Sequence, residues 1–310
     1  MPPAPAGDCV GGRVKVTVIH NPSAGEGSTA RRDLRRLLKA AGHEVVYRST
    51  KAKGWKQGIR DAEDLVLAVG GDGTVAKVAR RLAGRPVPLA MIPTGVGNNI
   101  ARALSHDLAI ERDEARVVDS LPSRTPEPFD LGVVSGGPPL DHFSEAVGVG
   151  LIPELIAESQ HRRKVEEVAH GEELQHSIDL AVELLEGMQP QRCRLIADGD
   201  DLSGDYLLVE VMNIRSAGPR IDFAPGADPH DGMLDVVALP ASSRDAAITA
   251  IRRGRPFDER VPAVRRLARE VELEWTAGHL HIDDSLWPDD ADSPCKATLG
   301  VDAGALLVLR

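Results

Sequence analysis

An apolar strand that ends in a run of glycines most constrains the fold of this 310-residue chain. Leu65–Val69 is continuously apolar, as expected for a strand that is buried on both faces. It leads directly into Gly70–Thr74 (GGDGT), after which Val75, Val78 and Leu82 mark one face of a helix. Strand-to-helix units of this kind build parallel sheets that bind ligands at the carboxyl ends of their strands. The sequence therefore predicts an α/β N-terminal domain around a Rossmann-like parallel sheet.

The pattern of elements changes after about residue 121. Before it, strands are predicted at 14–19, 44–48, 65–69 and 89–92, and helices at 34–41, 75–82 and 98–104. Beyond the Pro-rich segment 121–128, short strands are predicted at 131–134, 142–149, 192–197, 206–212, 234–239, 271–275, 279–283 and 305–309, interrupted by one helical stretch at about 153–188. These patterns indicate a mostly-β C-terminal sandwich domain with a helical insertion.

The predicted domain layout follows from this change. A flexible tail covers 1–12, an α/β domain covers 13–122, and a β-rich domain covers 129–302. The chain end, 303–310, is a candidate to return to the first domain.

Composition and charge narrow the class of protein. Lys and Arg number 37 against 47 Asp and Glu, a formal net charge of −10, which argues against a general nucleic-acid binder. No apolar run reaches the roughly 18 residues of a membrane span, and the first residues lack the regions of a signal peptide. The three scattered cysteines indicate neither a disulfide framework nor a metal cluster. We expect a cytoplasmic location.

Three turns are suited to bind phosphate groups. Glycines at Gly70–Thr74 allow a close backbone approach at a helix start, where N–H groups can hold phosphate oxygens. A second glycine turn, Pro93–Asn99, and a polar turn at 21–25 end two other strands of the same sheet. Their coincidence predicts a nucleotide site. Each turn could also be a purely structural connection, and whether Asn98 or Asn99 caps a helix or contacts a ligand stays open.

Taken in order, these segments resemble the diacylglycerol kinase catalytic-domain family, which includes soluble bacterial lipid kinases and sphingosine kinases. The motifs are N-P-x-[AS]-G at 21–25, T-x-x-K-G at 50–54, G-G-D-G-T at 70–74, P-x-G-T-x-N-[DN]-x-A-R at 93–102, a segment F-x-E-x-x-G-x-G at 143–150, and P-x-A-x-x-x-D-G-x-L-D at 225–235. The resemblance extends from residue 14 to the chain end. It implies two domains with ATP in the cleft between them, and transfer of the γ-phosphoryl group to a lipid hydroxyl.

The resemblance also implies roles for individual residues. The nucleotide would contact Asn21, Thr50, Gly70, Gly71, Asp72, Gly73, Thr74, Val75, Ala76, Val96 and Asn98. Asp72 would lie close to the transferring phosphate or its Mg²⁺. Asp231 would bind a second Mg²⁺, helped by the backbone carbonyls of Asp228 and Met233.

Two positions depart from the family pattern. Val96 stands where the family has Thr, so one hydroxyl contact to the nucleotide would be missing. The family's D-G-E, whose Glu is the expected general base, is Asp283-Asp284-Ser285 here, and a serine is no base at neutral pH without its own activator. The candidates for catalysis are therefore Asp72, Asp284 and Asp283, with Asp289 or Asp290 as other sources of a base.

The leading hypothesis is an ATP- and Mg²⁺-dependent lipid kinase that acts on a diacylglycerol-like or related amphipathic lipid. One alternative is a nucleotide-binding regulatory protein or pseudokinase with little turnover, and another is an NAD-kinase-like enzyme with a soluble substrate. Expected partners are ATP, the lipid and a transient contact with the inner membrane face, but no nucleic acid. Arg252, Arg253, Arg255, Arg265 and Arg266 form the candidate membrane patch. Whether the chain forms a homodimer stays open.

Overall fold

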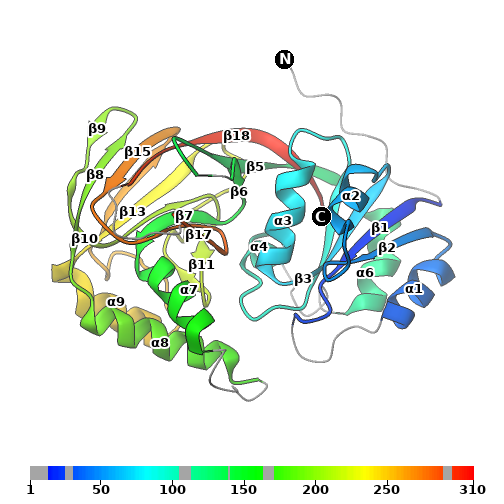
Figure 1. The fold of residues 1–310 in the computed structure, drawn as a ribbon, viewed down its shortest axis with the longest axis horizontal. Coiled ribbons are helices and arrows are strands. Elements are labelled where there is room, and N and C mark those ends of the chain that lie inside the picture. The colour runs from blue at the N-terminus through cyan, green and yellow to red at the C-terminus, as the bar shows by residue number, and fades with distance from the viewer. Residues whose placement is uncertain (1–12, 25–30, 105–112, 139, 163–170, 289–294) are drawn as a thin grey trace. The chain divides into compact units, whose positions relative to one another are not determined.

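The computed structural model describes residues 13–24, 31–104, 113–138, 140–162, 171–288 and 295–310. The predicted tail 1–12, Gly25, Asp289 and Asp290 lie outside these ranges. The chain divides into two compact units. Unit 1 contains the described residues up to Phe129 together with Ala303–Arg310, and unit 2 is Asp130–Asp302 (Figure 1).

Unit 1 is built on a parallel sheet, as predicted. Its strands are β1 (Lys15–His20), β2 (Glu44–Ser49), β3 (Leu65–Gly70) and β4 (Leu89–Pro93), in the order β4-β3-β1-β2. The end of β18 (Cys295–Leu309) adds to this sheet, because Val308 pairs in parallel with Leu89. The helices are α1 (Arg31–Ala40), α2 (Trp55–Arg60), α3 (Asp72–Leu82), α4 (Asn99–Leu104), α6 (Glu114–Ser120) and the 3-10 turn η1 (Leu121–Ser123).

Helices cover both faces of this sheet. Leu34 and Leu38 of α1 and Val117 of α6 pack with one set of strand residues, and α2 and α3 contact each other and the sheet (Figure 1). All six residues of β3 are buried, which explains why that strand is apolar without alternation. The sequence reading omitted α2 and α6. With six residues, one of them Gly58, α2 is too short to show a helical period.

Unit 2 is mostly β, as predicted, with antiparallel pairing of its strands. The strands are β5 (Pro126–Ser135), which begins in unit 1, β6 (His142–Phe143), β7 (Ala146–Gly150), β8 (Gln191–Ala197), β9 (Asp200–Asp201), β10 (Gly204–Met212), β11 (Ser216–Ala217), β12 (Ile221–Asp222), β13 (Leu234–Pro240), β14 (Val264–Ala268), β15 (Glu270–Trp275), β16 (Leu280–Ile282) and β17 (Ser285–Trp287). The order β17-β16-β7-β10-β8-β15 places β7 between β16 and β10.

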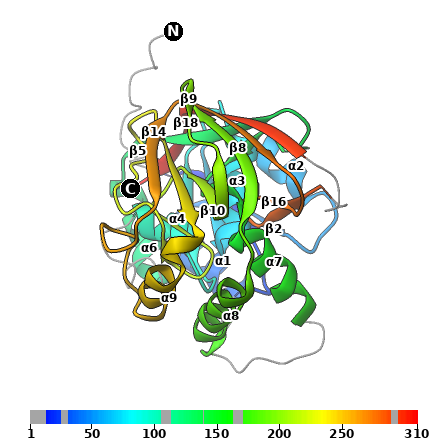
Figure 2. The same cartoon turned by 90° about the vertical axis from the view of Figure 1, so that its left-hand side faces the viewer.

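The helices of unit 2 gather on one side of its strands (Figure 2). They are α7 (Leu151–Arg162), α8 (Glu173–Gly187), α9 (Arg244–Arg252) and the turn η2 (Ala241–Ser243). The single helical stretch predicted at 153–188 is therefore two helices, and residues 163–170 between them lie outside the described ranges. Among the described helices, none is long and apolar enough to cross a membrane.

The predicted strand 142–149 is also divided in the structure, into β6 and β7. The backbone N–H groups of Ser144 and Glu145, between the two strands, donate to the Asp283 carboxylate instead of to a neighbouring strand. A side chain 138 residues away thus interrupts the strand, and a local pattern gives no signal of it.

Candidate functional site

The carboxyl ends of the parallel strands of unit 1 meet at one sheet edge. Parallel register pairs His20, the last residue of β1, with Ser49 of β2 and Val69 of β3, and it pairs Gly70 with Pro93 at the end of β4. Backbone N–H groups of Asn21, Thr50 and Thr94 extend the hydrogen-bond ladder one residue further, at 2.9 to 3.0 Å. The described parts of the three predicted turns, and Thr50 with them, therefore lie at the same edge.

Two glycine turns touch backbone to backbone at this edge. A Cβ atom on Gly95 would lie 2.5 Å from the Cα of Gly71, and one on Gly71 would lie 3.0 Å from the Cα of Gly95. The 2.5 Å distance excludes a side chain at position 95, and the 3.0 Å distance would force the two backbones apart at position 71, so the close approach favours glycine at both positions. Loops that leave only backbone at their surface are suited to surround phosphate groups.

Asn98 has a role that the sequence reading did not consider. Its backbone is left-handed, with φ of 53°, and its buried side chain closes the second glycine turn. Asn98 Oδ1 accepts from the N–H of Gly95 at 2.9 Å, and Nδ2 donates to the Gly95 carbonyl at 2.7 Å. Asn98 thus shapes the turn from within.

The N-terminus of α3 is aimed at the same edge. Gly71 is the N-cap and supplies no side-chain cap, while the N–H groups of Thr74 and Val75 donate to the Gly71 carbonyl. The first N–H groups of α3 point out of the helix end, and the positive end of the helix dipole lies there. Thr94 Oγ1, in the adjacent turn, is buried without a hydrogen-bond partner in the described part of the chain. These groups fit an anionic ligand.

Side-chain contacts connect the turns to one another. Asp72 Oδ1 accepts from the N–H of Ile100 at 3.1 Å, which joins the first glycine turn to the start of α4. Asn21 Nδ2 lies 3.4 Å from Thr74 Oγ1, which joins the first polar turn to α3. Val96 is half-buried in the second turn.

Two of the predicted nucleotide contacts, Val75 and Ala76, have buried side chains. The side chains of Val75 and Ala76 are 3% and 0% exposed, because they are on the face of α3 that packs into the core of unit 1. Only their backbone is available near the turn. The family motif continues into the helix at these positions, and the helical period turns the two side chains into the core.

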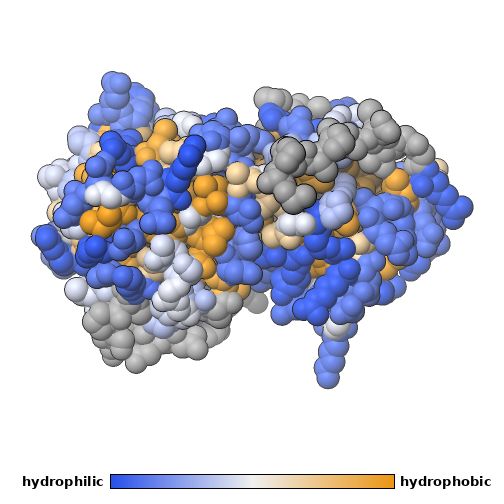
Figure 3. Space-filling view, turned by 90° about the horizontal axis from the view of Figure 1, so that it is seen from above, coloured by the Kyte–Doolittle hydropathy of each residue, from blue (hydrophilic) through white to orange (hydrophobic). Residues whose placement is uncertain are grey.

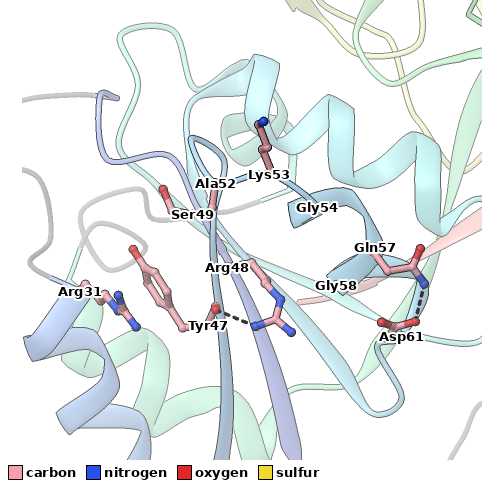
Figure 4. Close-up of a pocket in the computed structure, with 10 residues that line it drawn as sticks. All are labelled: Arg31, Tyr47, Arg48, Ser49, Ala52, Lys53, Gly54, Gln57, Gly58 and Asp61. Atoms are coloured by element: carbon pink, nitrogen blue, oxygen red, sulfur yellow. Dashed lines mark hydrogen bonds between the residues drawn. The ribbon is translucent and has the colours of Figure 1, made fainter.

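A cationic pocket of about 450 Å³ lies beside the end of β2. Arg31, Arg48 and Lys53 contribute its positive charges, and the guanidinium of Arg31 lies 4.7 Å from the centre of the Tyr47 ring. Figure 4 shows Arg31 and Tyr47 on one side of β2 and Arg48 on the other. The sequence reading missed this pocket because its residues come from α1, β2 and the β2–α2 turn, which only the fold brings together.

The predicted second metal site is a tight loop in unit 2. The Asp231 carboxylate accepts from the N–H of Met233 at 2.9 Å, and the N–H of Asp231 lies 3.4 Å from the Asp228 carbonyl. Burial, together with the charge of Asp231, raises the pKa of Asp235 to about 6. No group of three or more His, Cys, Asp or Glu side chains in the described ranges is placed to hold a metal ion. A cation here would therefore need backbone carbonyls as well.

The acidic turn that replaces the family's D-G-E joins β16 to β17. Asp283 is buried and left-handed, with φ of 51°, and its carboxylate accepts from the N–H groups of Ser144 at 3.0 Å and Glu145 at 2.8 Å. Asp284 is exposed and accepts from the Ser285 hydroxyl at 3.3 Å. These contacts favour Asp284 over Asp283 as the candidate for the base, because the oxygens of Asp283 already hold the turn in place.

Comparison with known proteins identifies the family. Residues 15–134 match the diacylglycerol kinase catalytic domain, and residues 157–297 match the YegS C-terminal NAD kinase beta sandwich-like domain. A diacylglycerol kinase of Mycobacterium tuberculosis is 26% identical, over 96% of this chain and 95% of its own length.

Two solved structures share the fold. A diacylglycerol kinase structure from Bacillus anthracis matches with a TM-score of 0.70 at 21% identity, over 95% of this chain and 96% of that one. Yeast NADH kinase in complex with NADH matches with a TM-score of 0.52 at 11% identity, over 96% of this chain and 83% of that one. The assignment to a family rests on the two family models, which match the chain in the same order as its two units. The chain belongs to the diacylglycerol kinase catalytic-domain family and has a YegS-type C-terminal domain.

Proposed function

We propose that this protein is an ATP-dependent lipid kinase that transfers the γ-phosphoryl group to a hydroxyl of a diacylglycerol-like lipid. The observation that carries the proposal is the backbone contact of Gly71 with Gly95 beside the N-terminus of α3. The N–H groups at this place can bind the negatively charged phosphates of a nucleotide. The protein as a whole, with its net charge of −10, would otherwise repel them. The similarity to a protein named diacylglycerol kinase supports the lipid as acceptor.

The proposed reaction is a direct displacement. The lipid hydroxyl oxygen forms a bond to the γ-phosphorus while the bond between that phosphorus and the oxygen of the departing ADP breaks. The hydroxyl proton passes to the carboxylate of Asp284, which is exposed, whereas the carboxylate of Asp283 is occupied by backbone donors. Positioning and charge stabilisation account for most of the rate in phosphoryl transfer, so a base one residue away from the family position is compatible with turnover.

We place Mg²⁺ at two positions in this proposal. Asp72 would hold the ion that accompanies ATP, and the Asp231 carboxylate with the carbonyls of Asp228 and Met233 would hold a second. Carboxylate and carbonyl oxygens are the donors that suit Mg²⁺. When bound, Mg²⁺ neutralises charge on the phosphate oxygens.

A substrate panel tests the proposal. Purified protein with Mg²⁺-ATP is offered diacylglycerol, monoacylglycerol, a sphingoid base and phosphatidylglycerol in mixed micelles, and NAD in buffer. We expect phosphorylation of a lipid and none of NAD. Phosphorylation of NAD alone would make the protein a soluble-substrate kinase. ATP binding in calorimetry without transfer to any acceptor would make it a nucleotide-binding protein with little turnover.

We also propose that the enzyme works in the cytoplasm and contacts the inner membrane face through the basic surface of α1, formed by Arg31, Arg32, Arg35, Arg36 and Lys39. The end of unit 1 on which α1 lies is mainly hydrophilic in the view from above (Figure 3). The patch expected from the sequence is less suitable, because three of its five side chains are engaged within unit 2. Arg252 pairs with Glu186, Arg265 donates to backbone carbonyls, and Arg266 pairs with Asp200.

Charge removal on α1 should weaken vesicle binding. Each Lys or Arg near an anionic bilayer contributes about 1 kcal/mol, so the triple variant Arg32→Gln, Arg35→Gln, Arg36→Gln should lose about 100-fold in affinity for phosphatidylglycerol vesicles at low salt. Co-sedimentation measures this. The matched control is Arg252→Gln, Arg253→Gln, Arg255→Gln on and after α9, which should bind like the wild type. Equal losses in both variants would refute a role specific to α1.

A further inference from the structure

A charged pair lies inside unit 2 and has no role in the site described so far. Glu210 of β10 is 0% exposed and His281 of β16 is 1% exposed. His281 Nε2 lies 2.7 Å from Glu210 Oε2, and His281 Nδ1 lies 3.0 Å from the backbone carbonyl of Asp283. Because a carbonyl only accepts, Nδ1 carries a hydrogen, so one further proton is shared between Nε2 and the carboxylate.

The pair is formed across an intervening strand. In the register, Glu210 lies opposite Gly148 of β7, and His281 lies opposite Gly148 on the other side. A Cβ atom on Gly148 would collide with the Glu210 carboxylate and with the Val209 carbonyl. The missing side chain at Gly148 is therefore what lets Glu210 and His281 meet, and this gives a physical reason for one glycine of the segment F-x-E-x-x-G-x-G.

From this pair, contacts lead directly to the acidic turn. His281 holds the Asp283 carbonyl, the N–H of Asp283 donates to the Ala146 carbonyl at 3.0 Å, and the Asp283 carboxylate receives the N–H groups of Ser144 and Glu145. Asp283 is thereby kept in a left-handed conformation that a non-glycine residue adopts at a cost. A conformation of this kind persists only where several contacts determine it together. The residue that follows is Asp284.

The pair is poorly explained as a source of stability. Burying two charged groups removes them from water, and well-packed apolar residues of the same size are often as stable or more stable. Glu210 Oε1 has no hydrogen-bond partner in the described part of the chain, so one oxygen is desolvated without compensation. A role in orienting the turn accounts for both the geometry and this cost.

We propose that Glu210 and His281 are positioning residues that fix the acidic turn and so set the place of the Asp284 carboxylate. This inference rests on the proposed function for its effect on rate, but the positioning itself can be measured without activity. Neither residue touches the substrate in this account.

The pair also gives the turn a pH dependence with a defined sign. Burial by itself lowers the pKa of His281, but the Glu210 charge and hydrogen bond, the Asp283 carbonyl and the Asp283 charge together raise it above its ordinary value. The charged groups that act on the ring are Glu210 from β10 and Asp283 at the turn, while Ala146–Gly150 of β7 contains no titratable side chain. Protonated His281 therefore stabilises the acidic turn fully below the ordinary pKa of histidine, and this stabilisation is lost as the pH rises through the raised pKa of His281.

Three variants separate the contacts of the pair. Glu210→Gln keeps the shape and removes the charge. His281→Gln is expected to keep a polar group near the Nε2 position and lose the donor to the Asp283 carbonyl, whereas His281→Asn is expected to keep that donor. His279→Gln is the matched control, since His279 lies just before the same strand and contacts the Pro288 carbonyl instead.

The measurements are kcat and KM for ATP as functions of pH, with hydrogen exchange of the Ser144 and Glu145 amides. We expect Glu210→Gln and His281→Gln to remain folded, to lower kcat by about 100-fold with KM for ATP unchanged, and to lose the alkaline step of the pH profile. Exchange at both amides should rise in these two variants, rise less in His281→Asn, and not change in His279→Gln.

The outcomes distinguish this inference from the proposed function. If the wild type phosphorylates no lipid but the exchange pattern holds, the proposed function fails and the positioning role stands. If Glu210→Gln and His281→Gln show wild-type exchange at Ser144 and Glu145 and a wild-type kcat, the positioning role is wrong. If one of these two variants unfolds, the other variant tests the positioning role, together with the wild type. In the wild type, exchange of the Ser144 and Glu145 amides relative to the intrinsic rate should then rise with pH, and a ratio independent of pH would contradict the role.

Discussion

Gly95→Ala is expected to abolish ATP binding and to lower the free energy of unfolding by about 1–3 kcal/mol. The added Cβ would lie 2.5 Å from the Cα of Gly71, and both partners are backbone, so no side chain can move aside. The turn that Asn98 closes would have to shift away from the N-terminus of α3. Calorimetric titration with Mg²⁺-ATP and urea unfolding measure the two effects.

The matched control for this substitution is Gly187→Ala. Gly187 ends α8 in unit 2, its backbone is not left-handed, and a Cβ there would meet no atom within 4 Å. We expect this variant to bind ATP like the wild type. If Gly95→Ala binds ATP with wild-type affinity, the two glycine turns do not form the nucleotide site.

Asp284→Asn is expected to lower kcat for lipid phosphorylation by about 10²–10⁴, with little change in KM for ATP. The amide keeps the size of the side chain but cannot accept the hydroxyl proton. Steady-state kinetics with the best lipid of the panel measure this. Ser285→Ala is the control and should retain wild-type kcat, because it removes only the hydroxyl that donates to Asp284.

A second substitution tests whether the lost activity can be rescued. Ser285→Glu places a carboxylate at the position where the family has its Glu, so it should restore activity to Asp284→Asn. Wild-type turnover in Asp284→Asn would exclude Asp284 as the base and direct attention to Asp289 and Asp290.

Local sequence patterns were sufficient for the elements that bury one continuous apolar segment. The run Leu65–Val69 and the glycines after it correctly predicted a central strand followed by a helix, and parallel register then brought the turns to one edge. At Val75 and Ala76 the same motif crosses from the turn into a helix, and the helical period buries the side chains, so only backbone contacts to a nucleotide are left for these two residues.

Contacts between distant residues could not be predicted in this way. Glu210 and His281 are 71 positions apart and meet only because Gly148, in a third strand, has no side chain. Asp283 was considered as a base because of its charge and its place in a motif, but the two amides that occupy it lie almost 140 positions earlier. Likewise, a net charge of −10 gave no indication of the basic surface of α1, where five of ten residues are Lys or Arg.

The central claim is that the glycine turns of unit 1 deliver the γ-phosphoryl group of ATP to a lipid hydroxyl. The most direct measurement follows ³²P from γ-labelled ATP into diacylglycerol in mixed micelles while ADP is quantified in the same samples. The account predicts labelled lipid and ADP in equal amounts, and neither above background with Gly95→Ala. ADP formed without labelled lipid, or labelled lipid formed equally by Gly95→Ala, would contradict it.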